Sequence, residues 1–361
     1  MVKQLLRLIC KRKVMPSNLI YFVTNKCNCK CKHCFFWKEI NKQEKELGLE
    51  EVQQVSKTIG TLLYLNITGG EPFLRKDLPE IVEAFYKNAK TKAVVIPTNG
   101  TLTKATVDMV TKMVQNCKGL NLVIYVSIDD IGEKHDKIRG FKGAFDKAAV
   151  TLKELKKIRN VSVGTLSTFS SLNQDRAKEI YYYIRDELKP EIAYFNVIRG
   201  DAKDASVKNI DINKYKELCD LIEKDMVSGK LSGYRSQWFW PLSLALNLET
   251  HKTVLKTLTE KKYNLPCYAG SLSAVMYSNG DIMPCELLNL KIGNVRDYGY
   301  DFKKLWNSEN AEKIRTTIKH TRCFCTHECF MNINLLFNPK RIPSLLYKSF
   351  KLICDRLRLR A

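Results

Sequence analysis

The sequence lacks any apolar run that approaches the roughly 18–20 residues needed to cross a bilayer. Its opening residues, MVKQLLRLICKRKVMPS, do not form a secretory signal, because the apolar stretch is too short and the charges come in the wrong order. Internal repeats and low-complexity linkers are absent too. These absences argue against a membrane-spanning or secreted protein, and we expect a cytoplasmic one.

Acidic residues are scarce beside basic ones: 38 Asp and Glu face 60 Lys and Arg, which leaves a net charge of +22. An excess this large indicates an anionic partner, whether nucleic acid, a phosphorylated substrate or acidic lipid. A lysine-rich solvated surface is the alternative reading of the same charge. The 361 residues, 45% of them hydrophobic, suffice for one large domain or two.

Cysteine, in contrast, is plentiful. Thirteen cysteines in a cytoplasmic chain should be reduced, so clusters of them indicate metal rather than disulfides. The densest cluster is "KCNCKCKHCFFW" at 26–37, with Cys27, Cys29, Cys31 and Cys34. We expect Cys10, Cys117 and Cys219 to be ordinary core or partly buried thiols.

Strand-like runs recur about every thirty residues and are nearly continuous in apolar and β-branched side chains, as in strands buried on both faces. They are 18–24, 62–67, 92–97, 122–128, 161–167 and 191–198. Segments with apolar residues at helical spacing separate them. Six such units predict a parallel sheet, either a partial barrel or a doubly wound sheet, with its chemistry at the carboxyl ends of the strands.

Polar or glycine-rich segments follow four of these strands. They are "TNKCNCKCKHC", "TGGEP" (68–72), "TNG" (98–100) and "SIDD" (127–130). Because the carboxyl ends of parallel strands share one edge, the four segments predict a single pocket.

Without Cys29, the first cluster reads Cys27-x3-Cys31-x2-Cys34. Three thiolates can hold three irons of a 4Fe–4S cluster and leave the fourth iron open for chemistry. A structural zinc site is the alternative, but it takes four closed ligands. Cys29 would complete such a set only with awkward ligands at alternate residues.

Three motifs in this order make the sequence similar to the radical S-adenosylmethionine (radical SAM) superfamily. They are the cysteine triad after the first strand, Gly69-Gly70-Glu71-Pro72 after the second, and "SIDDIGEKHDKIRGFKGAF" at 127–145. The resemblance covers about residues 17–200 and implies a partial (β/α)6 TIM-like barrel. It also implies that a reduced 4Fe–4S cluster cleaves S-adenosylmethionine to a 5′-deoxyadenosyl radical, which abstracts hydrogen from a substrate.

The resemblance assigns cluster ligation to Cys27, Cys31 and Cys34. It assigns S-adenosylmethionine binding to His33, Gly69, Gly70, Glu71, Asn99, Ser127 and Arg139. By position, His33 would lie near adenine, the Gly69–Glu71 backbone would hold the methionyl amino group, and Ser127 and Arg139 would hold the carboxylate. Asn99 would meet the ribose or a neighbouring loop. Arg139 as a surface residue and Asn99-Gly100 as a simple turn stay open, and Cys29 has no family role.

The carboxyl-terminal cysteines form a second region, with Cys267-x17-Cys285 and then "CFCTHEC". It is similar to the twitch and SPASM extensions of the same superfamily, which carry auxiliary 4Fe–4S clusters on a hairpin followed by a helix, here expected at 301–319. The cysteines suffice for one such cluster, held by Cys267, Cys285, Cys329 and either Cys323 or Cys325. A zinc site is the alternative. Glu286 is a candidate substrate base by this resemblance, or else a solvated surface residue.

The expected organisation is a small cysteine-rich hairpin-plus-helix domain attached to the barrel. The chain is expected to divide into five parts. They are a basic amphipathic segment at 1–16, the core barrel at 17–204, a helical connector at 205–262, the auxiliary iron–sulfur domain at 263–335 and a basic amphipathic tail at 336–361. We expect S-adenosylmethionine and a flavodoxin- or ferredoxin-type electron donor as partners. The alternative from another class, a zinc protein that binds nucleic acid, leaves the glycine-rich strand ends unexplained.

The sequence does not identify the substrate, and the superfamily catalyses dehydrogenation, epimerisation and carbon–sulfur or carbon–carbon bond formation. Because 26 residues precede Cys27 in this sequence, we expect no leader-binding domain before it. That favours a small-molecule or lipid-linked anionic substrate over a peptide, although a peptide-modifying maturase stays as the alternative.

Both ends of the chain are basic and apolar at helical spacing. Leu346, Phe350, Ile353 and Leu357 fall at i, i+4, i+7 and i+11, and Leu5, Leu6, Leu8 and Ile9 cluster near the start. Basic amphipathic helices are typical of membrane-surface elements, so we expect a peripheral position on the inner face of an anionic membrane. The alternative is that both helices pack on the barrel.

Overall fold

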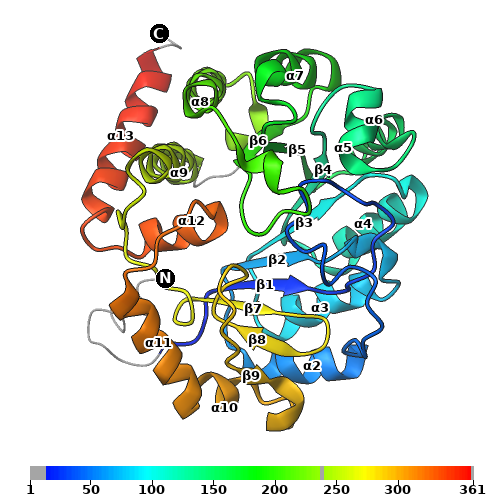
Figure 1. Ribbon diagram of the computed structural model, residues 1–361, viewed down its shortest axis with the longest axis vertical. Coiled ribbons are helices and arrows are strands. Elements are labelled where there is room, and N and C mark those ends of the chain that lie inside the picture. The colour runs from blue at the N-terminus through cyan, green and yellow to red at the C-terminus, as the bar shows by residue number, and fades with distance from the viewer. Residues whose placement is uncertain (1–13, 236–239, 359–361) are drawn as a thin grey trace.

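The computed structural model describes residues 14–235 and 240–358. Within this part of the chain, nine strands form one sheet in the order β6-β5-β4-β3-β2-β1-β7-β8-β9 (Figure 1). The strands are β1 Asn18–Phe22, β2 Tyr64–Thr68, β3 Ala93–Thr98, β4 Asn121–Ser127, β5 Ser162–Phe169, β6 Ile192–Val197, β7 Ser273–Met276, β8 Asp281–Met283 and β9 Gly293–Asn294. The helices are α2 Leu49–Thr58, α3 Leu78–Asn88, α4 Thr103–Asn116, α5 Glu133–Arg139, α6 Ala144–Leu155, α7 Ala177–Tyr183, α8 Ile212–Ser228, α9 Trp240–Glu260, α10 Phe302–Trp306, α11 Glu309–Thr321, α12 Glu328–Leu336 and α13 Ile342–Arg358.

Strands β1 to β6 are parallel to their neighbours, which confirms the predicted parallel sheet and open partial barrel. Their apolar runs are buried as expected; all five residues of β1 lie in the interior. The helices between the strands cover the outer face of the sheet, and α2, α3 and α4 cover its first half (Figure 1). This arrangement brings the carboxyl ends of six strands to one rim.

The carboxyl-terminal hairpin continues the barrel sheet. Strand β7 pairs in parallel with β1, with Asn18 opposite Ser273, and β8 and β9 follow as antiparallel strands. The Asn18 side chain donates to Ser273 Oγ at 3.2 Å and accepts from Asn66 Nδ2 at 2.7 Å, which ties β2, β1 and β7 together. The second cysteine region is therefore anchored directly beside the strand that leads into the first.

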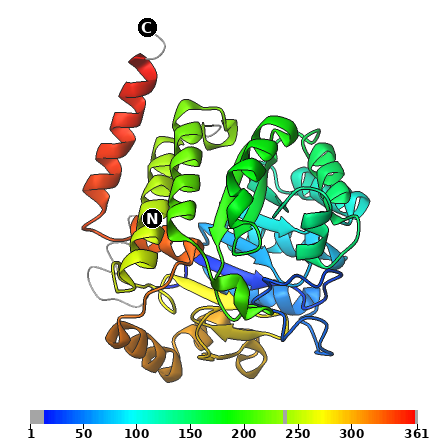
Figure 2. The same cartoon turned by 45° about the horizontal axis from the view of Figure 1, so that its top comes forward.

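The helix expected at 301–319 is two helices, α10 and α11. Ser308 lies between them, and its side chain accepts a hydrogen bond from the Ala311 amide, which begins a new helix there. The connector contains α8 and α9, and α9 packs against α12 and α13 (Figures 1 and 2). None of the helices in the described ranges has both the length and the apolar character that a membrane crossing needs. The amino-terminal segment, including Cys10, lies almost wholly outside the described residues.

Candidate active site

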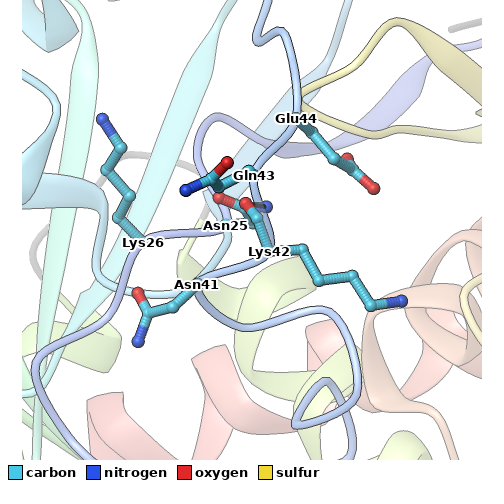
Figure 3. Close-up of a pocket in the computed structure, with 6 residues that line it drawn as sticks. All are labelled: Asn25, Lys26, Asn41, Lys42, Gln43 and Glu44. Atoms are coloured by element: carbon cyan, nitrogen blue, oxygen red, sulfur yellow. Dashed lines mark hydrogen bonds between the residues drawn. The ribbon is translucent and has the colours of Figure 1, made fainter.

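The first cysteine cluster lies on the loop that follows β1, at the rim of the barrel. Asn41 holds this loop from outside: its Oδ1 accepts from the Cys27 amide at 2.9 Å and its Nδ2 donates to the Cys27 carbonyl at 3.0 Å. An open pocket of about 530 Å³ adjoins this contact (Figure 3). It is lined by Asn25, Lys26, Asn41, Lys42, Gln43 and Glu44. The pocket lies beside the start of the cysteine loop.

Other strand ends fix the remainder of the loop. The Lys30 amide donates to the Arg139 carbonyl at 2.9 Å, and the Lys203 amide donates to the Cys34 carbonyl at 3.1 Å. The Asn28 side chain donates to Thr101 Oγ1 at 2.8 Å. The loop is thus pinned to the segments after β3, β4 and β6, and its thiols are held before any ligand arrives.

Gly69 and Gly70, after β2, are required by close backbone contact with this loop. A Cβ on Gly69, where φ is +139°, would lie 2.3 Å from the Thr24 carbonyl oxygen, and one on Gly70 would lie 2.2 Å from that of Lys26. The Gly70 amide donates to Thr24 and the Glu71 amide to Lys26. Any side chain at either glycine would displace the cysteine loop.

The three thiols of the predicted triad influence one another. The pKa of Cys27 is raised to about 12 and that of Cys34 to about 11, mainly by burial and in part by the charge of Cys31. Cys31 has a lowered pKa, because the Cys29 thiol hydrogen-bonds to it and Arg139 lies close by. Cys29 is therefore a hydrogen-bond partner of Cys31, one of the three predicted ligands, although the resemblance gave Cys29 no role.

Arg139 is buried, which excludes the surface reading. Its Nε lies 2.7 Å from Oδ2 of Asp129, which has no exposed surface, and its Nη1 lies 3.8 Å from Cys31 Sγ. His33 is also buried, with Nε2 3.8 Å from the same Asp129 oxygen. Its Nδ1 has no hydrogen-bond partner among the described residues. Arg139 therefore lies against the cysteine loop on the side of β4, where His33 of the loop approaches Asp129 and the buried Ser127 ends the strand.

Glu71 and Asn99 join the ends of β2 and β3. The buried Glu71 carboxylate accepts from Thr98 Oγ1 at 2.8 Å and from the Asn99 amide at 2.7 Å. Burial raises the pKa of Glu71 to about 7, although these hydrogen bonds oppose the rise. The Asn99 side chain donates to Asn28 Oδ1 at 2.8 Å and accepts from Thr101. Asn99 thus meets the neighbouring cysteine loop, one of the two contacts expected of it.

Three segments supply the second cysteine set. Cys267 precedes β7, Cys285 follows β8, and Cys325 lies between α11 and α12. Their charges raise one another's pKa: Cys325 and Cys267 act on Cys285, and Cys267 and Cys323 act on Cys325. Burial is the largest cause in each case. Cys323 is partly buried, which raises its pKa, and its charge raises the pKa of Cys267.

Cys329, on α12, lies beside a buried ionic cluster, which we call the Arg199 cluster: Arg199, Glu286, His327 and Glu328. Arg199 Nη1 lies 3.0 Å from Glu328 Oε2, and its Nη2 lies 3.4 Å from Glu286 Oε1. His327 Nε2 lies 2.6 Å from that Glu286 oxygen. Burial raises the pKa of Glu286, but His327 and Arg199 outweigh it and hold the pKa below its ordinary value. Glu286 is thus a buried carboxylate, which excludes the solvated surface reading.

The Arg199 cluster reaches toward the first cysteine loop. The Arg199 guanidinium lies 5.8 Å from the ring centroid of Phe35, the residue after Cys34. Phe36 stacks on Tyr277 of the hairpin with centroids 5.8 Å apart. One arginine and one aromatic stack therefore join the two cysteine sets.

The donor sets fit iron–sulfur clusters. Neighbouring thiolates repel one another, which keeps the thiols protonated in the absence of a cation. A cationic metal centre would remove this repulsion and bind the cysteines as thiolates. Cys27, Cys31 and Cys34 place three thiols on one loop, and Cys267, Cys285 and Cys325 place three more within electrostatic range of one another. The close-packed glycines and the unpaired His33 nitrogen lie around the first set, where a ligand of its open iron would be held. No three His, Cys, Asp or Glu side chains in the described ranges converge on a single ion.

Sequence reasoning missed Arg199, Asp129 and His327 as site residues. Arg199 follows β6 in "FNVIRG", so the rule that pointed to the other strand ends also applied to it. Asp129 stood within the "SIDD" motif, and His327 within "CFCTHEC". Their side chains had to be seen pairing in the interior before a role could be assigned.

Two family descriptions match the chain in the order that the motifs predicted. Residues 21–182 match the radical SAM superfamily, and residues 267–330 match SPASM, an iron–sulfur cluster-binding domain. The first range contains the triad, the glycines and Arg139. The second contains Cys267, Cys285, Cys323, Cys325 and Cys329 but not Cys354.

Several characterised proteins are similar in sequence. Fe-coproporphyrin III synthase of Methanosarcina barkeri is 31% identical over 58% of this chain and 54% of its own length. The subtilosin biosynthesis protein AlbA of Bacillus subtilis is 24% identical over 83% of this chain and 61% of its own length. An AdoMet-dependent heme synthase of M. barkeri is 26% identical over 83% and 84%. The chain thus spans less than two thirds of the first two relatives.

Solved structures share the fold. The enzyme anSMEcpe with bound AdoMet has a TM-score of 0.59 at 17% identity, over 95% of this chain and 98% of its own. Streptococcus suis SuiB bound to its precursor peptide SuiA has a TM-score of 0.60 at 18% identity, over 87% and 70%. The fold agrees with the two domain matches. Those matches place the chain in the radical SAM superfamily, whose cofactors are a 4Fe–4S cluster and S-adenosylmethionine, as a member with a SPASM iron–sulfur domain.

Proposed function

We propose that this chain abstracts a hydrogen atom from a small anionic substrate, free or lipid-linked, that binds between the two cysteine sets. The observation that carries the proposal is the Arg199 cluster, a buried ionic group between the triad loop and the SPASM cysteines. When bound, the 4Fe–4S cluster and S-adenosylmethionine would supply a 5′-deoxyadenosyl radical. One electron from the 4Fe–4S cluster breaks a carbon–sulfur bond of S-adenosylmethionine in this reaction.

The chain's own residues position these groups. Cys27, Cys31 and Cys34 would hold the cluster, and the Gly69–Glu71 backbone would lie against the methionyl end of the cofactor. Arg139, with Ser127, would hold its carboxylate. The pinned loop fixes these positions in advance, which lowers the cost of binding in the reactive geometry.

Glu286 is the proposed substrate base. It is buried beside Cys285, and His327 and Arg199 hold it ionised, so it can accept a proton. Arg199 and His327 are positioning residues in this proposal, because they orient the carboxylate. The auxiliary cluster would lie directly next to this base and accept or relay the electron that substrate oxidation releases.

The anionic substrate class has two supports. The net charge of +22 favours an anionic substrate. Two relatives are named as synthases of Fe-coproporphyrin III and of heme. AlbA and the peptide-bound SuiB support the alternative, a peptide-modifying maturase. The alternative of a zinc protein that binds nucleic acid is dropped, because the chain belongs to the radical SAM superfamily.

Electron supply is proposed to come from a flavodoxin- or ferredoxin-type protein. Lys26, Lys30 and Lys32 are exposed on the triad loop, and among the described residues none of them has an acidic partner. An acidic carrier would be steered to this loop, next to the cluster that it must reduce.

The experiment compares 5′-deoxyadenosine formation by anaerobically reconstituted enzyme with an iron coproporphyrin, with a lipid-linked carboxylate and with a cysteine-containing peptide. We expect an anionic small molecule to stimulate formation and to change in mass. Stimulation by the peptide alone would establish the maturase alternative. With the stimulating compound, Glu286→Gln should retain cofactor cleavage and slow product formation; equal product rates would remove Glu286 as the base.

A further inference from the structure

Helix α13 is attached to the protein along one face only. Leu345 is buried against Leu246 and Leu335. Ser349 is buried as well, and Lys348 contacts the Glu249 carboxylate of α9. Both views place α13 at the edge of the molecule, with its carboxyl-terminal half extending past the neighbouring helices (Figures 1 and 2).

The opposite face of α13 presents large apolar side chains to solvent. Leu346 is 58% exposed, Tyr347 69%, Phe350 64% and Ile353 40%. Ten large apolar side chains in the described ranges are exposed, and these four are the only group of them on one helix. Leu346, Phe350 and Ile353 follow at i, i+4 and i+7, so they form one stripe, with Tyr347 beside it. We call these four residues the α13 stripe.

Positive charge surrounds the α13 stripe. Residues 341–361 contain six Lys and Arg, with Asp355 as the single acid. Lys340 and Lys351 are exposed, and neither has an acidic partner among the described residues. Arg356, Arg358 and Arg360 add to this charge in sequence, although their side chains lie outside the described part. The surface is therefore apolar at its centre and cationic at its margins.

We propose that the α13 stripe docks this protein on an anionic lipid surface. The four apolar side chains would enter the boundary between head groups and acyl chains, and the surrounding cations would lie against lipid phosphates. A second copy of the chain is a poorer occupant, because its own α13 would bring the same excess of positive charge to the contact. Anionic lipid supplies both the apolar medium and the opposite charge.

Vesicle sedimentation tests the proposal with the full-length reconstituted protein. One set of vesicles contains phosphatidylglycerol and phosphatidylcholine in equal parts, and the other contains phosphatidylcholine alone. We expect binding to the anionic vesicles only. Raising the salt from about 0.1 M to about 1 M shortens the Debye length from about 10 Å to about 3 Å and should weaken that binding.

The decisive variant is Leu346→Ser/Phe350→Ser/Ile353→Ser. Because these side chains are exposed, its thermal midpoint should match that of the wild type, while its affinity for anionic vesicles falls at least about tenfold. A matched control, Val150→Ser/Tyr182→Ser, removes exposed apolar side chains from α6 and α7 and should bind like the wild type.

Three results would overturn the proposal. They are equal vesicle binding by the triple variant and the wild type, no binding to anionic vesicles at low salt, and a wild-type dimer that the triple variant loses without any vesicle binding. The last result would assign the α13 stripe to a second copy. None of them bears on cofactor cleavage, so the proposed function stands or falls separately.

Discussion

The guanidinium of Arg139 lies 2.7 Å from the carboxylate of Asp129, and both side chains are buried at the carboxyl end of β4. The pair links the triad loop to the barrel, because the same guanidinium also reaches Cys31. Arg139 therefore has a structural partner as well as its proposed role toward S-adenosylmethionine, and an experiment has to separate the two.

Arg139→Ala should lower the free energy of unfolding by about 3–5 kcal/mol, because it leaves the Asp129 charge buried and unpaired. Asp129→Asn in the same chain removes that charge and keeps the acceptor for the Thr168 amide, so the double variant should recover much of the stability. Chemical denaturation measures this recovery. Affinity for S-adenosylmethionine should stay at least about tenfold weaker in both variants. A double variant that binds the cofactor like the wild type would limit Arg139 to a structural role.

Cys325 is expected to be a ligand of the auxiliary cluster, and Cys323 is not. Cys325 interacts electrostatically with both Cys267 and Cys285, whereas Cys323 interacts in this way with Cys267 and Cys325. Iron analysis should give about eight irons for the wild type and for Cys323→Ala, and about four for Cys325→Ala. The reverse pattern would exchange the two assignments.

The parallel strands and the gathering of polar segments at their carboxyl ends could be predicted because each depends on a local pattern. Continuous apolar runs identify buried parallel strands, and short motifs at their ends identify the rim. The parallel pairing of β7 with β1 could not be predicted, because a four-residue apolar strand does not specify which sheet edge it joins. The division of 301–319 into two helices depended on a single serine cap, which periodicity alone does not reveal.

The Arg199 cluster shows a second limit. Arg199, Glu286 and Glu328 are far apart in sequence, and as isolated charged residues they resemble solvated surface. Only the fold brings the ends of β6 and β8 and the start of α12 together, where the side chains of Glu286 and Glu328 are buried and that of Arg199 is 18% exposed. Sequence patterns thus do not show which charged side chains become buried, and burial decides whether such a side chain is part of a site.

Protein-mediated reduction should depend on the lysines of the triad loop. Lys26→Glu/Lys30→Glu/Lys32→Glu reverses three exposed charges beside the cluster, so the rate of 5′-deoxyadenosine formation with an acidic flavodoxin should fall at least about tenfold at low salt. The rate with dithionite should not change. Lys252→Glu/Lys256→Glu/Lys319→Glu, on α9 and α11, is the matched control. An equal loss in both variants would place the docking surface elsewhere.

Glu51 joins α2 to the segment after β9. It accepts from Arg296 at 3.0 and 3.2 Å and from the Tyr300 hydroxyl at 2.7 Å, and the Arg296 contact is the largest cause that lowers the pKa of Glu51 to about 2. A carboxylate with a depressed pKa stabilises the fold above its unfolded pKa of about 4.3, and this stabilisation is lost as the pH falls toward the folded value.

Glu51→Gln should therefore cost about 1–2 kcal/mol of unfolding free energy at pH 7, and the gap from the wild type should narrow between about pH 5 and pH 2. Urea denaturation over this range measures the gap. A constant difference across these pH values would show that the carboxylate charge does not stabilise the junction.

The most direct test of the account is iron content and cofactor cleavage in the same preparation. Anaerobically reconstituted wild-type protein should contain about eight irons and cleave S-adenosylmethionine to methionine and 5′-deoxyadenosine under a strong reductant. Cys27→Ala/Cys31→Ala/Cys34→Ala should retain about four irons and show no cleavage, while Cys117→Ala, at a buried thiol outside both sets, should match the wild type. Cleavage that survives the triple change would contradict the assignment of the active site.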